Sequence, residues 1–118
     1  MTETWDILVP SIIDEEALSI VEDFTEIHTY DADCTPSELL EEIEVCEAFV
    51  HRTVPVDERI LDRAEALQII SKHGVGVDLI DVDAASERGI FVCNTPGANA
   101  RAVGEMAITL LLAAWKEL

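Results

Sequence analysis

The stretch LQIISKHGVGVDLIDVDAASERGIFVCNTPG, residues 67–97, decides the fold of this chain. It contains two short apolar runs, 67–71 and 90–93, in which β-branched residues are frequent and turn residues follow, as is typical of buried strands. Between them, residues 81–88 have the length and composition of a short helix, and Gly89 follows where a helix would stop. A strand, a helix and a second strand in this order predict a βαβ unit with parallel strands.

The first predicted strand leads into a loop with two glycines, KHGVGVD, residues 72–78. Gly74 and Gly76 allow the backbone to approach a ligand closely and to point successive N–H groups at it, which suits a carboxylate. The alternative is a tight turn that needs glycine only for its own geometry. The loop also resembles the start of a dinucleotide fingerprint, G-x-G-x-x-G/A. We exclude that interpretation because Leu79 occupies the third small position and no acidic residue lies about 20 positions further on.

The sequence SKHGVGVDLIDVDAASERGIFVCNTPGANARAVGEMAITLLLAAWKEL resembles the N-terminal part of the D-isomer-specific 2-hydroxyacid dehydrogenases, nearest to the phosphoglycerate dehydrogenases. The resemblance covers residues 48–118 and rests on GVGVD-x-ID, the C-x-TPG-x-N turn and the V-x-E helix, whereas residues 1–47 match only in their strand–helix rhythm. It implies hydride transfer between NAD and a 2-hydroxyacid, with 3-phosphoglycerate as a candidate substrate. In the family's order, the cofactor fingerprint and the catalytic Arg, Glu and His follow position 118. We therefore expect a fragment without catalytic residues that is inactive alone.

The resemblance also implies a substrate site in the glycine loop, at the carboxyl ends of the strands, where open α/β sheets bind ligands. The loop consists of Gly74, Val75 and Gly76, and the amides of Val75 and Gly76 are expected to bind the substrate carboxylate. Val75 is also expected to contact the nicotinamide ring of NAD, which another domain would hold.

Arg52 and Thr53 are further candidates for substrate binding, because a guanidinium forms a fork suited to carboxylate or phosphate. The resemblance, an Arg followed by Ser or Thr, supports this role and favours a phosphorylated substrate. The alternative is an ion pair between Arg52 and a neighbouring acid such as Asp57 or Asp78.

The histidines and cysteines form no catalytic or metal-binding motif. We expect structural histidines, reduced cysteines and no metal site; these residues are His28, His51, His73, Cys34, Cys46 and Cys93. The N-terminus does not resemble a signal peptide, so the expected location is the cytoplasm.

The chain is strongly acidic, with 25 Asp and Glu against 7 Lys and Arg and a formal net charge of −18. Such a charge argues against nucleic acid or an anionic membrane as a partner, and no apolar run approaches the ~18 residues of a membrane span. The acids are explained either as an ordinary solvated surface or as halophilic adaptation to a high-salt cytoplasm, where screening acts within about 3 Å at 1 M salt. We favour the second explanation, because acids replace lysine along the whole chain.

Predicted strands and helices alternate along the chain and define an α/β fold. The expected architecture is a flavodoxin-like parallel five-stranded sheet, order 2-1-3-4-5, with helices on both faces. Residues 1–98 are expected to form the substrate domain, and residues 99–118 an interdomain helix, capped by Asn99, that leads to an NAD-binding Rossmann domain. The other predicted strands are 6–9, 26–30 and 48–50, and the other predicted helix caps are Asp14, Thr35 and Asp57.

The last predicted helix is apolar around almost its whole circumference. Only a narrow polar stripe interrupts it, formed by Arg101, Glu105, Thr109 and Lys116. A helix of this kind must be buried on several sides, and one sheet covers only one of them. We therefore expect residues 102–118 to pack against another domain or to form a homodimer interface.

Two non-enzymatic interpretations share this fold. A phosphoacceptor receiver domain needs an Asp after the third strand and a Lys after the fifth, but the chain has His51-Arg52 and Asn94-Thr95 there. A dehydrogenase-like module that senses NAD without turnover remains an open alternative.

Overall fold

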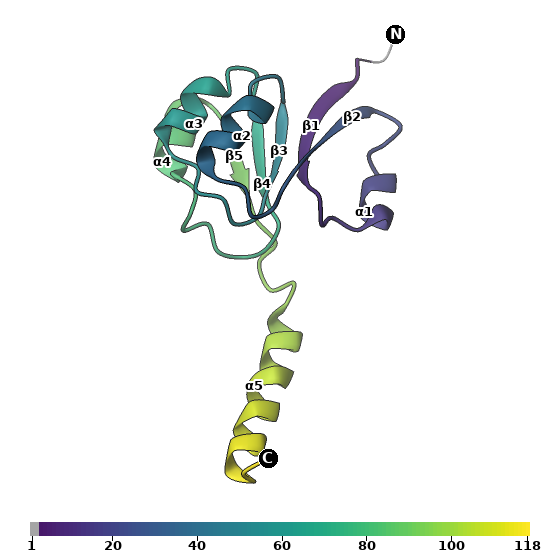
Figure 1. Cartoon of the computed structure of the whole chain (residues 1–118), viewed down its shortest axis with the longest axis vertical. Helices are drawn as coiled ribbons and strands as arrows, with labels where there is room; N and C mark the ends of the chain where they lie inside the picture. The colour runs from purple at the N-terminus through teal and green to yellow at the C-terminus, as the bar shows by residue number, and fades with distance from the viewer. Residues whose placement is uncertain (1–2) are drawn as a thin grey trace.

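The computed structural model describes residues 3–118, in which five strands and five helices alternate (Figure 1). The strands are β1 (Trp5–Pro10), β2 (Thr25–Tyr30), β3 (Ala48–His51), β4 (Ile69–Lys72) and β5 (Phe91–Cys93). The helices are α1 (Glu15–Ser19), α2 (Pro36–Ile43), α3 (Glu58–Arg63), α4 (Val82–Glu87) and α5 (Ala100–Trp115).

The strands form one parallel sheet in the order β2-β1-β3-β4-β5, which confirms the predicted flavodoxin-like fold. The βαβ unit β4-α4-β5 is present as predicted. Its first strand begins at Ile69 rather than at Leu67, because the Leu67 amide closes a turn on the Ala64 carbonyl at 3.1 Å. Leu67 is still buried in the core.

Three helices, α2, α3 and α4, cover one face of the sheet (Figure 1). On the three central strands the side chains Leu8, Phe49 and Ile70 of this face are fully buried. The helix starts follow the sequence: Thr35 and Glu38 form a complete capping box on α2, and the side chain of Asp57 accepts from the Ile60 amide on α3. Such caps satisfy amides that a helix leaves unpaired at its start.

Helix α1 is shorter than the sequence indicates, because the helical spacing of Ala17, Ile20, Val21 and Phe24 predicts a helix that continues to Phe24. Asp14 caps it as predicted, but the helix ends at Ser19, and Ile20 is 73% exposed. The acids Glu22 and Asp23 follow three and four residues after Ser19, and negative charge is unfavourable near a helix C-terminus.

The second face of the sheet carries a row of apolar side chains that crosses all strands in register. This apolar row consists of Ile27, Ile7, Ala48, Ile69 and Phe91. The segment after α1 approaches it only near β1, where Val21 and Phe24 line a cavity of about 210 Å³ together with Ile7 and Ala48. Phe91, at the other end of the row, is 75% exposed. Coverage of this face is therefore confined to the β1 side.

Helix α5 extends away from the sheet (Figure 1), and none of its residues is buried. Asn99 stands at its start, but its side chain makes no capping hydrogen bond, contrary to the prediction. The ψ of Asn99 is 5°, outside the extended range in which a capping side chain reaches back over the first turn. Among the helices of residues 3–118, none has the length and apolar character needed to cross a bilayer.

Candidate functional site

The glycine loop lies at the carboxyl end of β4, and its carbonyl groups are held from β5. The amide and the hydroxyl of Thr95 donate to the Gly74 carbonyl at 3.0 and 2.9 Å, and the Asn94 side chain donates to the Val75 carbonyl at 2.8 Å. The amides of Val75 and Gly76 donate to no group within residues 3–118. The loop is thus fixed through its acceptors while its donors remain available to a ligand. Asn94 and Thr95 were not predicted to have this role.

The two glycines of the loop differ in what they require. Gly74 has a φ of +140°, which disfavours other residues, so the turn itself needs glycine there. Gly76 has no positive φ, and a Cβ added to it would meet only the Asp78 carboxylate at 3.5 Å, an ordinary contact. The chain's own packing therefore does not demand glycine at position 76, whereas close approach of a ligand would.

The guanidinium of Arg52 lies beside this loop, at the end of β3. Its Nη1 is 3.4 Å from Nδ1 of the exposed His73, the residue before Gly74. Within residues 3–118, no carboxylate lies within ion-pair distance of Arg52, and Asp57 instead contacts Arg59 at 3.5 Å. The ion pair considered as the alternative is absent there, so the charge of Arg52 remains available.

Lys72 is a second cation at this edge, and sequence reasoning did not select it. Its ammonium group donates to the backbone carbonyl of Arg52. Burial lowers the pKa of Lys72, the nearby charge of Arg52 lowers it further, and Asp78 acts in the opposite direction. A signal was available in the sequence, because Lys72 directly follows a predicted strand in a chain with only 7 Lys and Arg.

The other cations of the chain are engaged elsewhere. Lys116 lies over the Trp115 ring, 5.3 Å from its centroid. Four arginines form surface ion pairs with carboxylates: Arg59, Arg63, Arg88 and Arg101. Arg52 and Lys72 therefore form the one place in the described chain where positive charge gathers without an acidic partner.

Thr53 is exposed, but its hydroxyl donates to the Ala32 carbonyl at 3.1 Å. A hydroxyl has a single proton to donate, so in this arrangement it ties β3 to the segment after β2. Thr53 then has no side-chain proton left for a carboxylate.

His51 lies below the site, inside the core. It is fully buried, its Nε2 is 2.7 Å from the Val54 carbonyl, and its Nδ1 has no partner in the described chain. Burial lowers the pKa of His51, and the charge of Lys72 adds to this shift. A neutral imidazole that donates from Nε2 fits these contacts, in agreement with the predicted structural role.

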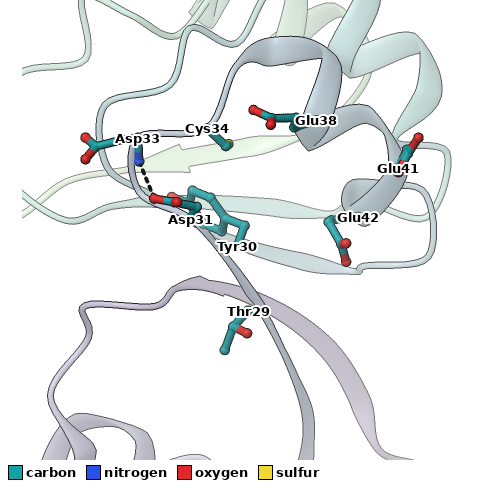
Figure 2. A pocket seen from close by; sticks show the side chains of 8 residues that line it. All are labelled: Thr29, Tyr30, Asp31, Asp33, Cys34, Glu38, Glu41 and Glu42. Atoms are coloured by element: carbon teal, nitrogen blue, oxygen red, sulfur yellow. Dashed lines mark hydrogen bonds between the residues drawn. The ribbon is translucent and has the colours of Figure 1, made fainter.

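Two other features of the structure lie apart from the loop. Figure 2 shows a cavity of about 380 Å³ after β2, lined by several carboxylates, among them Asp31, Asp33 and Glu42. Its charge is wrong for an anionic substrate. Near the start of β1, donor atoms of Asp6, Glu26 and His28 lie within 4.8 Å of one another, and a 2.6 Å contact between His28 and Asp6 accounts for two of them.

A parallel sheet with free loop amides and unpaired cations at its carboxyl edge is an arrangement suited to an anionic ligand. The model of the family "D-isomer specific 2-hydroxyacid dehydrogenase, catalytic domain" matches residues 7–113. The chain therefore belongs to the D-isomer-specific 2-hydroxyacid dehydrogenases.

The relatives of this chain are named for several different activities. The chain is 40% identical over 109 residues to D-3-phosphoglycerate dehydrogenase of Methanocaldococcus jannaschii, covering 92% of this chain and 21% of that protein. It is 35% identical over 111 residues to glyoxylate reductase of Korarchaeum cryptofilum, covering 92% and 33%. The crystal structure of NAD+-bound 3-phosphoglycerate dehydrogenase from Entamoeba histolytica superposes with a TM-score of 0.84 at 27% identity, covering 93% of this chain and 39% of that one. The chain thus spans a fifth to a third of the length of these two curated relatives.

Proposed function

We propose that this chain is the substrate-binding portion of an NAD-dependent D-2-hydroxyacid dehydrogenase. Residues 1–98 form part of the substrate domain, and residues 99–118 form the helix that leads to the NAD-binding domain. The observation that carries the proposal is the pair of free amides at Val75 and Gly76, beside an Arg52 that has no acidic partner in the described chain.

In this proposal the chain positions the substrate and performs no proton chemistry. The amides of Val75 and Gly76 bind the carboxylate, and each charge-assisted bond contributes about 1.5–3 kcal/mol. Arg52 supplies a planar fork with full charge at the same edge.

NAD would accept or return the hydride in this family of reactions. Within this chain, only the Val75 side chain is expected to contact it. The Val75 side chain is 39% exposed at the loop and fits against a flat ring. The loop does not fit the cofactor's diphosphate, because Leu79 stands where close packing needs a small residue. NAD is therefore bound mainly by residues outside this chain.

The pair Arg52 and Lys72 favours a substrate with more than one negative charge, such as 3-phosphoglycerate. One cation suffices for a carboxylate, whereas a phosphate carries up to two charges and accepts several hydrogen bonds. The relative named as a phosphoglycerate dehydrogenase agrees with this choice.

A titration of the isotope-labelled chain with 3-phosphoglycerate and with D-glycerate, followed by amide NMR shifts, tests the site. We expect saturable shifts at Val75 and Gly76 and tighter binding of the phosphorylated acid. Arg52→Ala should weaken binding by about tenfold or more, and Gly76→Ala should weaken it by crowding the ligand. Arg63→Ala, which removes a cation paired with Glu44, is the matched control. Shifts that avoid the loop, or equal affinity in all variants, contradict the proposal.

The acidic surface supports a second proposal, that this protein works in a high-salt cytoplasm. All three cysteines are free, which suits a reducing compartment. With only 7 Lys and Arg against 25 acids, the folded chain repels itself unless salt screens the charges. Thermal unfolding in KCl from about 0.05 to 2 M should show a rising midpoint that continues above the range where ordinary domains level off. A midpoint that is indifferent to KCl contradicts this.

We also propose that residues 102–118 mediate association with a second copy. The apolar side chains of α5 are exposed, including Leu111 at 71% and Trp115 at 76%. Exposed apolar surface of this extent marks an interaction site.

A further inference from the structure

We infer that Asn94 and Thr95 are positioning residues that aim the two free amides of the glycine loop at the carboxylate of the substrate. Thr95 sets the direction of the Val75 amide, and Asn94 sets the direction of the Gly76 amide. The inference rests on the proposed carboxylate site and names the residues that orient it.

The first argument is the planarity of the peptide bond. A trans peptide unit holds its C=O and its N–H in one plane, pointing in opposite directions, and residues 3–118 contain no cis peptide bond. The Gly74 carbonyl shares its unit with the Val75 amide, and the Val75 carbonyl shares its unit with the Gly76 amide. A side chain that holds one of these carbonyls therefore directs the amide of the same unit to the opposite side.

The second argument is that the two carbonyls are held by different residues. The Gly74 carbonyl accepts from the amide and the hydroxyl of Thr95, at 3.0 and 2.9 Å. The Val75 carbonyl accepts from the Asn94 side chain at 2.8 Å. A carbonyl oxygen can only accept, so the NH2 group of Asn94 faces it. Each of the two peptide units is thus fixed separately, and each presents one amide without a partner in the described chain.

The third argument is that the loop does not hold this orientation by packing. Each of the two units has a glycine at one end, and glycine adopts many backbone angles. A Cβ added at Gly76 would meet nothing closer than the Asp78 carboxylate at 3.5 Å, and Val75 and Gly76 are both exposed. A rotated unit would present a carbonyl oxygen, which repels a carboxylate, where the amide now lies. The hydrogen bonds to the carbonyls oppose that rotation, and they also polarise the amides as donors.

Amide shifts induced by D-glycerate test the inference on the isotope-labelled 118-residue chain. Asn94→Ala removes the only bond to the Val75 carbonyl, so binding should weaken about two- to tenfold, the range for one hydrogen bond. The induced shift of Gly76 should then fall more than that of Val75. Thr95→Val removes the hydroxyl but keeps the backbone bond, so it should weaken binding less and reduce mainly the shift of Val75. Thr95→Ser keeps the hydroxyl and should match the unmodified chain.

Thr109→Val is the matched control, because the Thr109 hydroxyl also donates to a backbone carbonyl, that of Glu105, but lies on α5. It should leave the affinity and both induced shifts unchanged. Asn94 and Thr95 are exposed, so their variants should fold, and the amide spectrum away from the loop shows whether they do.

Three outcomes overturn the inference, and one of them also overturns the proposed site. Unchanged affinity in Asn94→Ala and Thr95→Val would leave the carboxylate site intact and remove both residues from the positioning role. Equal losses of the Val75 and Gly76 shifts in both variants would show a general loosening of the turn, again without affecting the proposed site. Loop amides that do not respond to D-glycerate in the unmodified chain would overturn the site and the inference together.

Discussion

The two faces of the sheet carry apolar side chains of the same kind but differ in how far these side chains are buried. Phe49 on β3 faces the helices and is fully buried, whereas Phe91 on β5 faces the opposite way and is 75% exposed. Both rows are apolar along most of their length, as expected for strands of a parallel sheet. The difference lies in what covers them. Helices α2, α3 and α4 pack on one face, whereas α5 extends away from the sheet and does not cover the other face.

This contrast shows that one face is covered by helices of the described chain, whereas the other is covered there only near β1. The closed face provides the stability that fixes β3 and β4 and, with them, Arg52, Lys72 and the glycine loop. The open face contributes little to the isolated domain. Stability and association should therefore respond to different substitutions.

The largest effect that tests the contrast is the truncation of Phe49. Phe49→Ala should lower the free energy of unfolding by about 3–5 kcal/mol, because it leaves a cavity in a packed core. Phe91→Ala, its matched control on the open face, should change it by less than about 0.5 kcal/mol. Urea unfolding at low protein concentration, where association is minimal, measures both values. Similar losses for the two substitutions would mean that the second face is covered in solution even in the monomer.

The sequence was sufficient for the sheet because its signals were local. The apolar runs, the capping box at Thr35 and the glycine after α4 each define an element without reference to distant residues. The length of α1 was predicted wrongly from the spacing of its apolar residues, because Glu22 and Asp23 oppose a longer helix. The exposure of Phe91 could not be predicted either, since an apolar strand residue looks the same whether or not its cover belongs to the same chain.

The sequence singled out the glycine loop as a candidate site, but not the hydrogen bonds that hold it. Gly74 and Gly76 stand out in the sequence, and the structure leaves the amides next to them free. Lys72 joins Arg52 only because β3 and β4 pair in register, which depends on the fold. The hydroxyl bond of Thr53 depends on the position of Ala32 and has no sequence signal.

A smaller effect comes from the polar side chain on the closed face. Burial lowers the pKa of His51 in the folded chain from its ordinary 6.5 and so disfavours its protonated form. The unfolded chain binds a proton more readily, so this contribution to stability is complete above pH 6.5 and is lost as the pH falls below it. One proton limits the slope to about 1.4 kcal/mol per pH unit.

His51→Gln keeps a donor for the Val54 carbonyl and removes the titration. The unfolding free energy of this variant should fall less steeply below pH 6.5 than that of the unmodified chain, as urea titrations at successive pH values would show. His73→Gln, in the exposed loop, is the control and should follow the unmodified chain. Parallel curves for all three proteins would mean that His51 does not couple folding to pH.

The smallest expected effect comes from the helix starts. The start of α2, which covers one face of the sheet, is compared with the start of α5, which extends away from the sheet. Thr35 caps α2 through its side chain, whereas Asn99 at the start of α5 makes no such bond. Thr35→Ala should therefore cost about 1 kcal/mol of unfolding free energy, while Asn99→Ala should have no measurable effect in the monomer. If Asn99→Ala destabilises the chain as much as Thr35→Ala does, the start of α5 is part of the cooperative fold, and the helix does not simply extend from a completed domain.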